Sequence, residues 1–449
     1  MALFGSPDVS QLFSKKDIKG LIKALRYQKD WFVRSEAASC LGNLMDKRAT
    51  EPLILALSDK EKKVQESAAQ ALGKIGDPKA VAPLFDMIRN ISGYHYEKPA
   101  QAILEIGPSA FDALLIGLKD VDWRIRATAA RALGKIGDPK AVQLLISALM
   151  DKRDIVPRIE AANALGQIGD ILAVEVLIGT LDEQGRVGRL RKAAAVALGC
   201  IGDERAIFPL IAALSDNEVD VATAAGSALS CFGTVAIEPL VAALKGRQGA
   251  NRYIGLKALC QFGQPAVPHL LNFLNNPISL SANIAAEGLQ KIGHQPNDLQ
   301  VRAAYYIALG QPERCTEIGH PAVEPLISAL ASFDQKIKRS VVKVLGEIGD
   351  SQSIEALINL LDERDLNLRY NVAKALEAIG EEAVNPLMNA LQASNWYIRE
   401  LAARTLGQIG DIRAINALSD LLQDDEYIVR KAAEEAIDKL SCEGKEEHH

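Results

Sequence analysis

Apolar residues recur every three or four positions in the segment 122–149, DWRIRATAARALGKIGDPKAVQLLISAL, and one break divides this pattern in two. Before the break, one face of a predicted helix carries four apolar residues, Ile125, Ala129, Leu133 and Ile136. The break itself is Gly137-Asp138-Pro139, where glycine ends a helix and proline cannot continue it. A second apolar helix then ends near Leu149. The segment therefore predicts a helical hairpin.

The same hairpin recurs along nearly the whole chain. The glycine that closes the longer helix returns every 30 to 33 residues, with one shorter interval of 26: Gly76, Gly107, Gly137, Gly169, Gly202, Gly233, Gly263, Gly293, Gly319, Gly349, Gly380 and Gly410. With an opening and a closing unit, this period gives about fourteen units. One helix pair cannot cover its own apolar face, so neighbouring pairs must stack and share a core. The expected fold is an all-α solenoid.

The ends of the longer helices resemble a known repeat family. LGKIGDPKAVAPL from Leu72, LGKIGDPKAV from Leu133 and LGQIGDIRAINAL from Leu406 are similar to the HEAT repeats of bilin (phycobilisome) lyase-like proteins. The resemblance extends from about residue 17 to residue 440. It implies a right-handed α-solenoid of about 14 HEAT-like units, mostly helix pairs. It implies little about function, since such repeats occur in scaffolds, adaptors and a few enzymes.

The repeat pattern also divides the chain into segments. Residues 1–16 form a polar lead that caps the exposed end of the solenoid, because terminal repeats face water. Residues 17–293 and 320–440 form two blocks of regular repeats. Between them, residues 294–319 lack the first helix of a unit, so we predict a hinge there. The tail 441–449 ends in His448 and His449, which we interpret as part of a purification tag.

The third unit departs from the pattern between its two helices. There NISGYHYEKPAQAILEIG replaces the usual opening of the second helix, and Pro99 suits the first position of a helix. We expect the second helix to be about one turn shorter, after a loop that holds Tyr94, His95 and Tyr96. Tyrosine is enriched at binding hot spots, so this loop is the leading candidate contact site. The alternative is that its rings fold back over the gap left by the missing turn.

A cation occupies the same position near the start of the second helix in ten units: Arg34, Arg126, Arg158, Arg191, Arg252, Arg302, Lys338, Arg369, Arg399 and Arg430. One interpretation is an anion-binding ladder. The interpretation we favour is structural, with each cation reaching the Asp of an Ile-Gly-Asp turn, such as Asp138 or Asp170, and tying adjacent layers together. Exposed pairs of this kind contribute about 0–1 kcal/mol each.

Charge is distributed unevenly between the two blocks. The chain has a net charge of −6 and a pI near 5.7. Residues 320–440 contain 13 Lys and Arg against 20 Asp and Glu, a net charge of −7, whereas residues 1–319 carry +3. A partner spanning both blocks is expected to present acid to the first and base to the second. The basic runs at 186–192 and 336–343 form no continuous basic face, which argues against nucleic-acid binding.

Targeting and redox signals are weak. No apolar run approaches the 18 residues of a membrane helix, and MALFGSPDVS lacks the regions of a signal peptide. We therefore expect a soluble, cytoplasmic protein without membrane contact. The six cysteines have no C-x-x-C or metal-type spacing, and we interpret them as reduced structural thiols.

Catalytic chemistry has no recognisable motif in the sequence. HEAT-repeat di-iron hydroxylases are similar in fold and carry paired His-Glu dipeptides on their inner helices, whereas no His precedes Glu in the repeats of this chain. Phosphate-binding loops, nucleophile elbows and Cys/His pairs are not recognisable either. We predict no catalytic, cofactor-binding or metal-binding residues and no cofactor.

The remaining candidate is the concave face, which the second helices line in HEAT solenoids. The residues predicted to project from it as partner contacts are Phe32, Arg124, Arg131, Arg189, Tyr397 and Arg404. This face is long and mixed in character, which favours a non-catalytic scaffold or adaptor that binds a protein partner. The resemblance offers an alternative, a bilin lyase or lyase-isomerase-type subunit that binds an open-chain tetrapyrrole. No motif here would position a bilin or its thioether cysteine.

Overall fold

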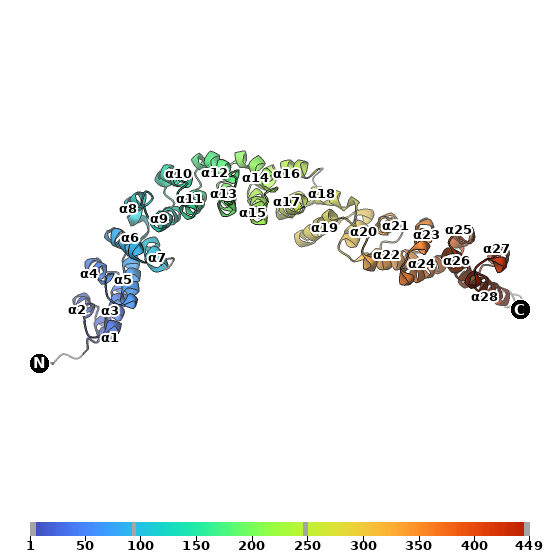
Figure 1. Cartoon of the computed structure of the whole chain (residues 1–449), viewed down its shortest axis with the longest axis horizontal. Coiled ribbons are helices and arrows are strands. Elements are labelled where there is room, and N and C mark those ends of the chain that lie inside the picture. Colours follow the sequence, from blue (N-terminus) through green and yellow to red (C-terminus); the bar gives the residue numbers. More distant parts are fainter. Residues whose placement is uncertain (1–5, 92–95, 246–249, 444–449) are drawn as a thin grey trace. The chain divides into compact units, whose positions relative to one another are not determined.

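Local signals at the ends of the second helix organise the regular repeats in the computed structural model (Figure 1). In the repeat that opens at Asp122, this side chain accepts a hydrogen bond from the backbone N–H of Arg124 and caps the helix. The helix ends at Gly137, whose φ of 75° places it in the left-handed region that only glycine adopts without strain. The boundaries of the second helices therefore follow directly from the sequence.

The structure describes residues 6–91, 96–245 and 250–443, and these ranges contain helices and turns but no strand. The chain divides into two compact units, Met1–Gly246 and Arg247–His449. The predicted hinge segment 294–319 lies inside the second unit, and the division between the units precedes it. The hinge therefore stays a prediction.

The first unit begins with α1 (Val9–Ser14) and continues as helix pairs. The first helices of its pairs are α2 (Ile18–Ala24), α4 (Thr50–Ala56), α6 (Val81–Asn90), α8 (Phe111–Gly117), α10 (Val142–Met150), α12 (Val174–Leu181), α14 (Ile207–Ala213) and α16 (Ile237–Leu244). The second helices are α3 (Trp31–Leu44), α5 (Lys62–Ile75), α7 (Glu97–Ile106), α9 (Trp123–Ile136), α11 (Ile155–Ile168), α13 (Gly188–Ile201) and α15 (Val219–Ser230).

The second unit continues the same alternation. Its first helices are α18 (Val267–Leu271), α21 (Val323–Ala329), α23 (Ile354–Asn359), α25 (Val384–Ala390) and α27 (Ile415–Asp420). Its second helices are α17 (Ala250–Gln261), α19 (Leu280–Ile292), α20 (Leu299–Ala308), α22 (Gln335–Ile348), α24 (Leu366–Ile379), α26 (Trp396–Ile409) and α28 (Tyr427–Glu443). Counted over the described ranges, the helices make fourteen repeats. This confirms the predicted all-α solenoid of about fourteen HEAT-like repeats.

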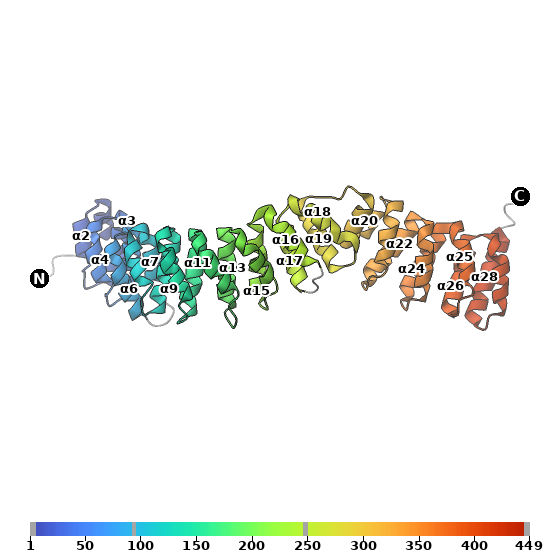
Figure 2. The same ribbon diagram turned by 90° about the horizontal axis from the view of Figure 1, so that it is seen from above.

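Within each of the two compact units, the first helices of the repeats form one layer and the second helices form another (Figures 1 and 2). The second helices pack closely because a glycine of one faces an alanine of the next. A methyl group on Gly166 would lie 2.7 Å from Cα of Ala197, closer than carbon atoms normally approach. Among the described residues six further pairs repeat this contact: Gly42 and Ala71, Gly73 and Ala102, Gly134 and Ala164, Gly199 and Ala228, Gly346 and Ala375, Gly407 and Ala436.

The two layers differ in how tightly they pack. Second helices of neighbouring repeats make many contacts, whereas first helices touch their counterparts much less. Closer spacing in one layer bends a stack toward that layer. The exposed side of the second helices is therefore the concave side of each unit, and we call it the inner face.

Several of the repeated cations tie consecutive repeats together, as expected, but not through the predicted partner, whereas Arg302 and Arg430 donate to backbone carbonyls of their own repeats. Arg34 donates to Asp59 at 2.7 Å, Arg191 to Asp216 at 2.7 Å, Lys338 to Glu363 at 2.8 Å and Arg399 to Asp424 at 2.7 Å. Each acid lies in the loop between the two helices of the following repeat. The prediction of exposed pairs was also wrong, since Arg34 is only 3% exposed.

The acids of the Ile-Gly-Asp turns have a local role instead. Asp138 accepts a hydrogen bond from the backbone N–H of Lys140 at 2.9 Å, and Asp170 does the same for Leu172 at 2.9 Å. Each side chain thereby caps a short 3-10 turn that leads into the next first helix. The carboxylates predicted to pair with the cations are therefore already occupied by their own backbone.

The two irregular repeats follow the sequence in part. α7 has ten residues where regular second helices have fourteen, so the predicted loss of one turn is confirmed. Pro99 occupies the third position of α7, not the first as predicted. In the later irregular repeat, α20 is followed by the 3-10 turns η10 (Pro312–Cys315) and η11 (His320–Ala322), and Tyr305 and Tyr306 are buried beside them. The guanidinium of Arg314, in η10, lies 4.1 Å from the ring centroid of Tyr306.

Candidate functional site

Two of the predicted contact residues of the first unit lie free on the inner face. Phe32 is 58% exposed in the first turn of α3, where its ring meets Trp31 edge-on with the centroids 6.1 Å apart. Arg189 is exposed in the first turn of α13, and within the described residues its guanidinium forms no ion pair. Both side chains are therefore accessible to a partner.

Arg124 does not project into solvent as predicted. Its guanidinium pairs with Asp122 at 2.5 Å and also donates to the backbone carbonyl of Ile91, so the side chain is largely buried. The hydrogen bond from Arg124 holds the pKa of Asp122 below its usual value. Arg124 therefore links the third repeat to the fourth, and its side chain is not accessible to a partner.

Arg131 is half-buried, and its Nε atom lies 3.9 Å from a carboxylate oxygen of Glu160 on the neighbouring helix α11. Burial raises the pKa of Glu160, while the nearby Arg131 charge lowers it and Glu97 raises it further. Arg131 therefore belongs to a partly desolvated charge cluster on the inner face.

The predicted contact loop is described only at its end. Tyr94 and His95 lie outside the described residues. Tyr96 is 6% exposed, and its ring packs edge-to-face on Trp123 with the centroids 5.9 Å apart. This corrects the prediction for Tyr96, because a buried ring cannot present its area to a partner. For this residue the alternative, in which the ring folds back onto the stack, describes the structure.

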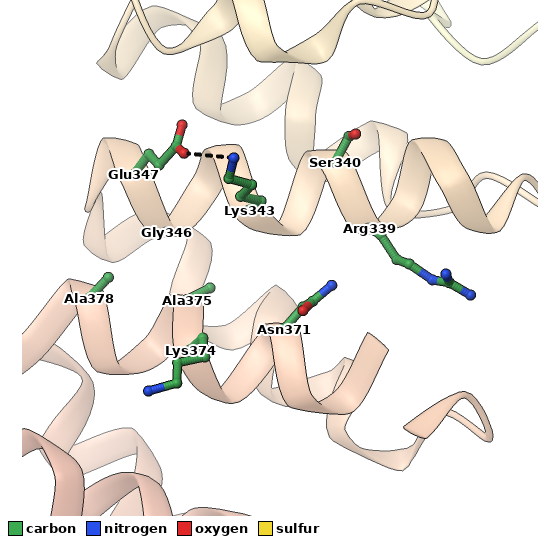
Figure 3. Close-up of a pocket in the computed structure, with 9 residues that line it drawn as sticks. All are labelled: Arg339, Ser340, Lys343, Gly346, Glu347, Asn371, Lys374, Ala375 and Ala378. Carbon is green, nitrogen blue, oxygen red and sulfur yellow. Dashed lines mark ion pairs between the residues drawn. The ribbon is translucent and has the colours of Figure 1, made fainter. Parts of the chain in front are cut away.

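The second unit contains a groove on the inner face between α22 and α24, with a volume of about 410 Å³ (Figure 3). Its floor is made of small residues, Gly346, Ala375 and Ala378. Polar side chains surround this floor: Arg339, Ser340, Lys343, Glu347, Asn371 and Lys374. The groove exists because the close contact of Gly346 with Ala375 leaves nothing large above it.

The charges around this groove are largely neutralised within the protein. Arg339 pairs with Asp365 at 2.7 Å, Lys343 with Glu347 at 3.5 Å, and Lys374 with Glu377 at 2.8 Å. Figure 3 shows the Lys343 and Glu347 side chains meeting above the groove floor. The hydroxyl of Ser340 is also occupied, since it donates to a carboxylate oxygen of Glu313 at 2.6 Å. Polar recognition is what this arrangement can provide.

Tyr397 and Arg404 lie further along the same face, on α26. The Tyr397 ring stacks on Trp396 with the centroids 3.5 Å apart, and the guanidinium of Arg369 lies 4.4 Å from the Tyr397 centroid. Arg404 pairs with Glu400 at 2.6 Å and with Glu435 at 3.0 Å, which raises its pKa. Both side chains remain partly exposed.

Sequence reasoning missed the groove and two exposed aromatic residues on the second helices of the second unit. Tyr370 on α24 is 61% exposed and Tyr427 on α28 is 67% exposed. The available signal was a tyrosine within the first five residues of successive second helices. For the groove, the signal was Gly346 and Ala375, which stand 29 residues apart like Gly42 and Ala71.

Across residues 6–91, 96–245 and 250–443, no three His, Cys, Asp or Glu side chains gather where they could hold a metal ion. In the same ranges, each helix is too short or too polar to cross a membrane.

Stacked helix pairs with glycine-closed second helices and an accessible inner face define a HEAT-type solenoid. A family model described as HEAT repeats matches residues 18–94, 91–158, 111–189, 145–230, 294–369, 323–387 and 354–438. Phycocyanobilin lyase subunit alpha of Pseudanabaena tenuis is 30% identical over 267 residues, which cover 57% of this chain and 81% of that protein. The chain belongs to the HEAT-repeat proteins of the bilin lyase type.

Other similarities are more limited. Phycocyanobilin lyase subunit alpha of Picosynechococcus sp. is 41% identical over 83 residues, or 17% of this chain, and the match spans only 31% of that relative's length. Importin beta, a solved structure, covers 95% of this chain and 72% of its own, with 15% identity and a TM-score of 0.41.

Proposed function

We propose that this protein is a non-catalytic scaffold that binds a protein partner along its inner face. The observation that carries the proposal is a division of roles within each second helix. Glycine–alanine contacts and buried ion pairs hold the stack. The exposed positions of the same helices, such as Phe32 and Arg189, are free of that role. Rigid aromatic and arginine side chains are the residues that anchor protein interfaces. The cytoplasmic location expected from the sequence stays part of this proposal.

The bilin lyase type supports a second candidate function. The relative named phycocyanobilin lyase subunit alpha matches this chain over most of its own length. A subunit of this kind would bind an open-chain tetrapyrrole on the inner face. The groove between α22 and α24 offers cations at its rim, although each of them already has an acidic partner.

Affinity capture from the lysate of the native host, followed by mass spectrometry, would identify the partner. The captured protein would then be titrated against Phe32→Ala and Arg189→Ala. The matched control is Phe208→Ala, because Phe208 is an exposed aromatic on the first helix α14, in the other layer. We expect at least one inner-face variant to bind about tenfold more weakly or worse, and the control to bind as the wild type does. Unchanged affinity in both inner-face variants would refute the proposal.

A spectroscopic titration separates the two candidates. If the chain binds an open-chain tetrapyrrole, mixing it with phycocyanobilin should shift and sharpen the visible absorbance band. If the protein is only a scaffold, the mixture should show the unchanged absorbance spectrum of free phycocyanobilin. A saturable shift would favour the second candidate.

A further inference from the structure

We propose that the inner face formed by the first turns of α24, α26 and α28 is a docking surface for an arginine-rich segment of a protein partner. This inference rests on the proposed function and names the chemistry of the partner at one end of the solenoid. We call this surface the tyrosine edge, defined by Tyr370, Tyr397, Tyr427, Asp425 and Glu426.

The three helix starts lie side by side. The side chain of Asn395, just before α26, donates to Asp362 in the loop before α24. On the other side, Arg399 of α26 forms paired hydrogen bonds of 2.7 and 2.9 Å with Asp424, just before α28. These contacts join the first turns of three consecutive second helices into one surface, which lies in the last layers of the second unit in Figure 1.

Large apolar area is exposed along this edge. Tyr370 and Tyr427 are each more than half exposed, and Tyr397 remains accessible over part of its ring. Leu366 and Ile428, in the first turns of α24 and α28, are exposed beside them. An exposed apolar patch with polar surroundings is typical of an interaction site. Aromatic residues make up only 5% of this chain, so their grouping here is notable.

Charge selects the kind of partner. Residues 344–440 contain 9 Lys and Arg against 18 Asp and Glu, a net charge of −9. At the edge itself, Asp425 and Glu426 are exposed, and within the described residues neither carboxylate takes part in an ion pair. Acidic side chains around a rigid apolar patch complement a basic segment.

The protein's own contacts indicate arginine in preference to lysine. The guanidinium of Arg369 lies 4.4 Å from the Tyr397 centroid, and that of Arg430 lies 5.9 Å from the Tyr427 centroid. These rings therefore already accept guanidinium groups. A planar guanidinium stacks on an aromatic ring and pairs with carboxylates in a fixed fork, whereas an ammonium is a compact and strongly hydrated charge. Tyr370, with its exposed ring, offers a further position of this kind.

The neighbouring groove gives the surface a limit. The one acid that lines the groove between α22 and α24, Glu347, already pairs with Lys343, whereas Asp425 and Glu426 form no ion pair within the described residues. The arginine-rich segment is therefore favoured on the side of α24 that faces α26 and α28.

The test uses the full chain and a fluorescein-labelled synthetic peptide of four Arg-Gly-Leu repeats, with binding followed by fluorescence anisotropy at low and high salt. Peptides with Lys or Glu in place of every Arg serve as comparisons. Tyr370→Ala combined with Tyr427→Ala removes the two most exposed rings of the edge. Asp425→Asn combined with Glu426→Gln removes two charges and no apolar area.

Each double variant has a matched control. Phe208→Ala removes an exposed aromatic from a first helix of the other unit. Glu381→Gln combined with Glu382→Gln makes the same charge change in the same block, but beyond the far end of α24. At 1.5 Å per residue, that end lies about 20 Å from the first turn of α24.

We expect the arginine peptide to bind, the lysine peptide to bind about fivefold more weakly or worse, and the glutamate peptide not to bind. The tyrosine variant should weaken binding about tenfold. The carboxylate variant should weaken it about threefold at low salt and less at high salt, since salt screens exposed charges. The controls should bind almost as the wild type does. Circular dichroism should remain unchanged, because every substituted side chain is exposed.

Three results would overturn the inference: an arginine peptide that binds no more tightly than the glutamate peptide, a tyrosine variant that binds like the wild type, or self-association of the chain that the tyrosine variant abolishes. The last result would assign the surface to a second copy of the chain. If the peptide fails while the captured partner still depends on Phe32 or Arg189, the scaffold function stands and this inference falls.

Discussion

Replacing Gly166 by alanine tests the contact that sets the spacing of the second helices. The added methyl group would lie 2.7 Å from Cα and 2.9 Å from Cβ of Ala197. Carbon atoms prefer separations of about 3.5–4.0 Å, so α11 and α13 would have to move apart by roughly 1 Å. Neither atom belongs to the end of a flexible side chain, and the backbone itself must therefore shift. Overpacking of this kind costs about 1–3 kcal/mol.

The control is Gly179→Ala in α12, the first helix of the next pair. Gly179 is exposed, and an added methyl group would meet no atom within 4 Å. Alanine is favoured over glycine inside a helix by about 1 kcal/mol, so this variant should be slightly more stable than the wild type. Both substitutions gain the same helix propensity. The difference between the two variants therefore isolates the packing cost, and the Gly166 variant should be less stable than the control by about 1–3 kcal/mol.

Urea unfolding followed by circular dichroism measures the difference in the free energy of unfolding. Repeat proteins can lose all-or-none cooperativity, because each repeat contacts only its neighbours. Hydrogen exchange should therefore be measured as well, and it should accelerate in α11 and α13 of the Gly166 variant only. Equal stability of the two variants, with equal exchange in these helices, would refute the idea that glycine sets the spacing.

Three other predictions follow from the fold. Asp59→Asn leaves the buried guanidinium of Arg34 without a carboxylate and should cost about 3 kcal/mol at pH 7. Because the hydrogen bond from Arg34 lowers the pKa of Asp59, this stabilisation is complete above about pH 4 and is lost as the pH falls through the folded-state pKa. If the urea midpoints of the wild type and the Asp59→Asn variant differ as much at acid pH as at pH 7, this prediction is wrong. Tyr96→Ala removes a buried ring and should cost about 3 kcal/mol in a thermal melt, whereas Tyr370→Ala should leave the melting temperature nearly unchanged. Residues 299–318 should exchange hydrogen faster than the flanking helices, because the missing first helix leaves less shared core; equally slow exchange would exclude a hinge.

The helices could be predicted closely because their signals are local. The segment 122–149 predicts one helix that ends at the Gly137 break and a second that ends near Leu149, and in the structure α9 ends at Ile136 and α10 at Met150. The limits of α9 depend on the capping side chain of Asp122, on Gly137 and on apolar spacing within the helix. Because the repeat recurs about every thirty residues, the same local signals predict the corresponding helices along the chain.

The partners of side chains were harder to predict, because they depend on the next repeat. Arg34 reaches Asp59, which stands 25 residues further on in a loop. The acids of the Ile-Gly-Asp turns recur at a regular position, which favoured them as partners of the cations. That regularity reflects their role as caps of the following turn. Tyr96 presents the same difficulty, since its burial depends on Trp123 in the following repeat. Spacing along one chain does not reveal which loop lies above a given side chain.

The division of roles within the second helix explains how one repeat can carry a varied surface. The glycine and alanine of each close contact cannot change without moving a helix, and the buried cations cannot lose their acids without leaving a charge in the core. The exposed position one or two turns before the closing glycine has no such constraint. In three successive second helices of the second unit it is Lys343, Lys374 and Arg404. Under the proposed function, the inner face can distinguish the two directions in which an extended partner could lie, because Asp425 and Glu426, which form no ion pair within the described residues, favour its basic segment toward α28.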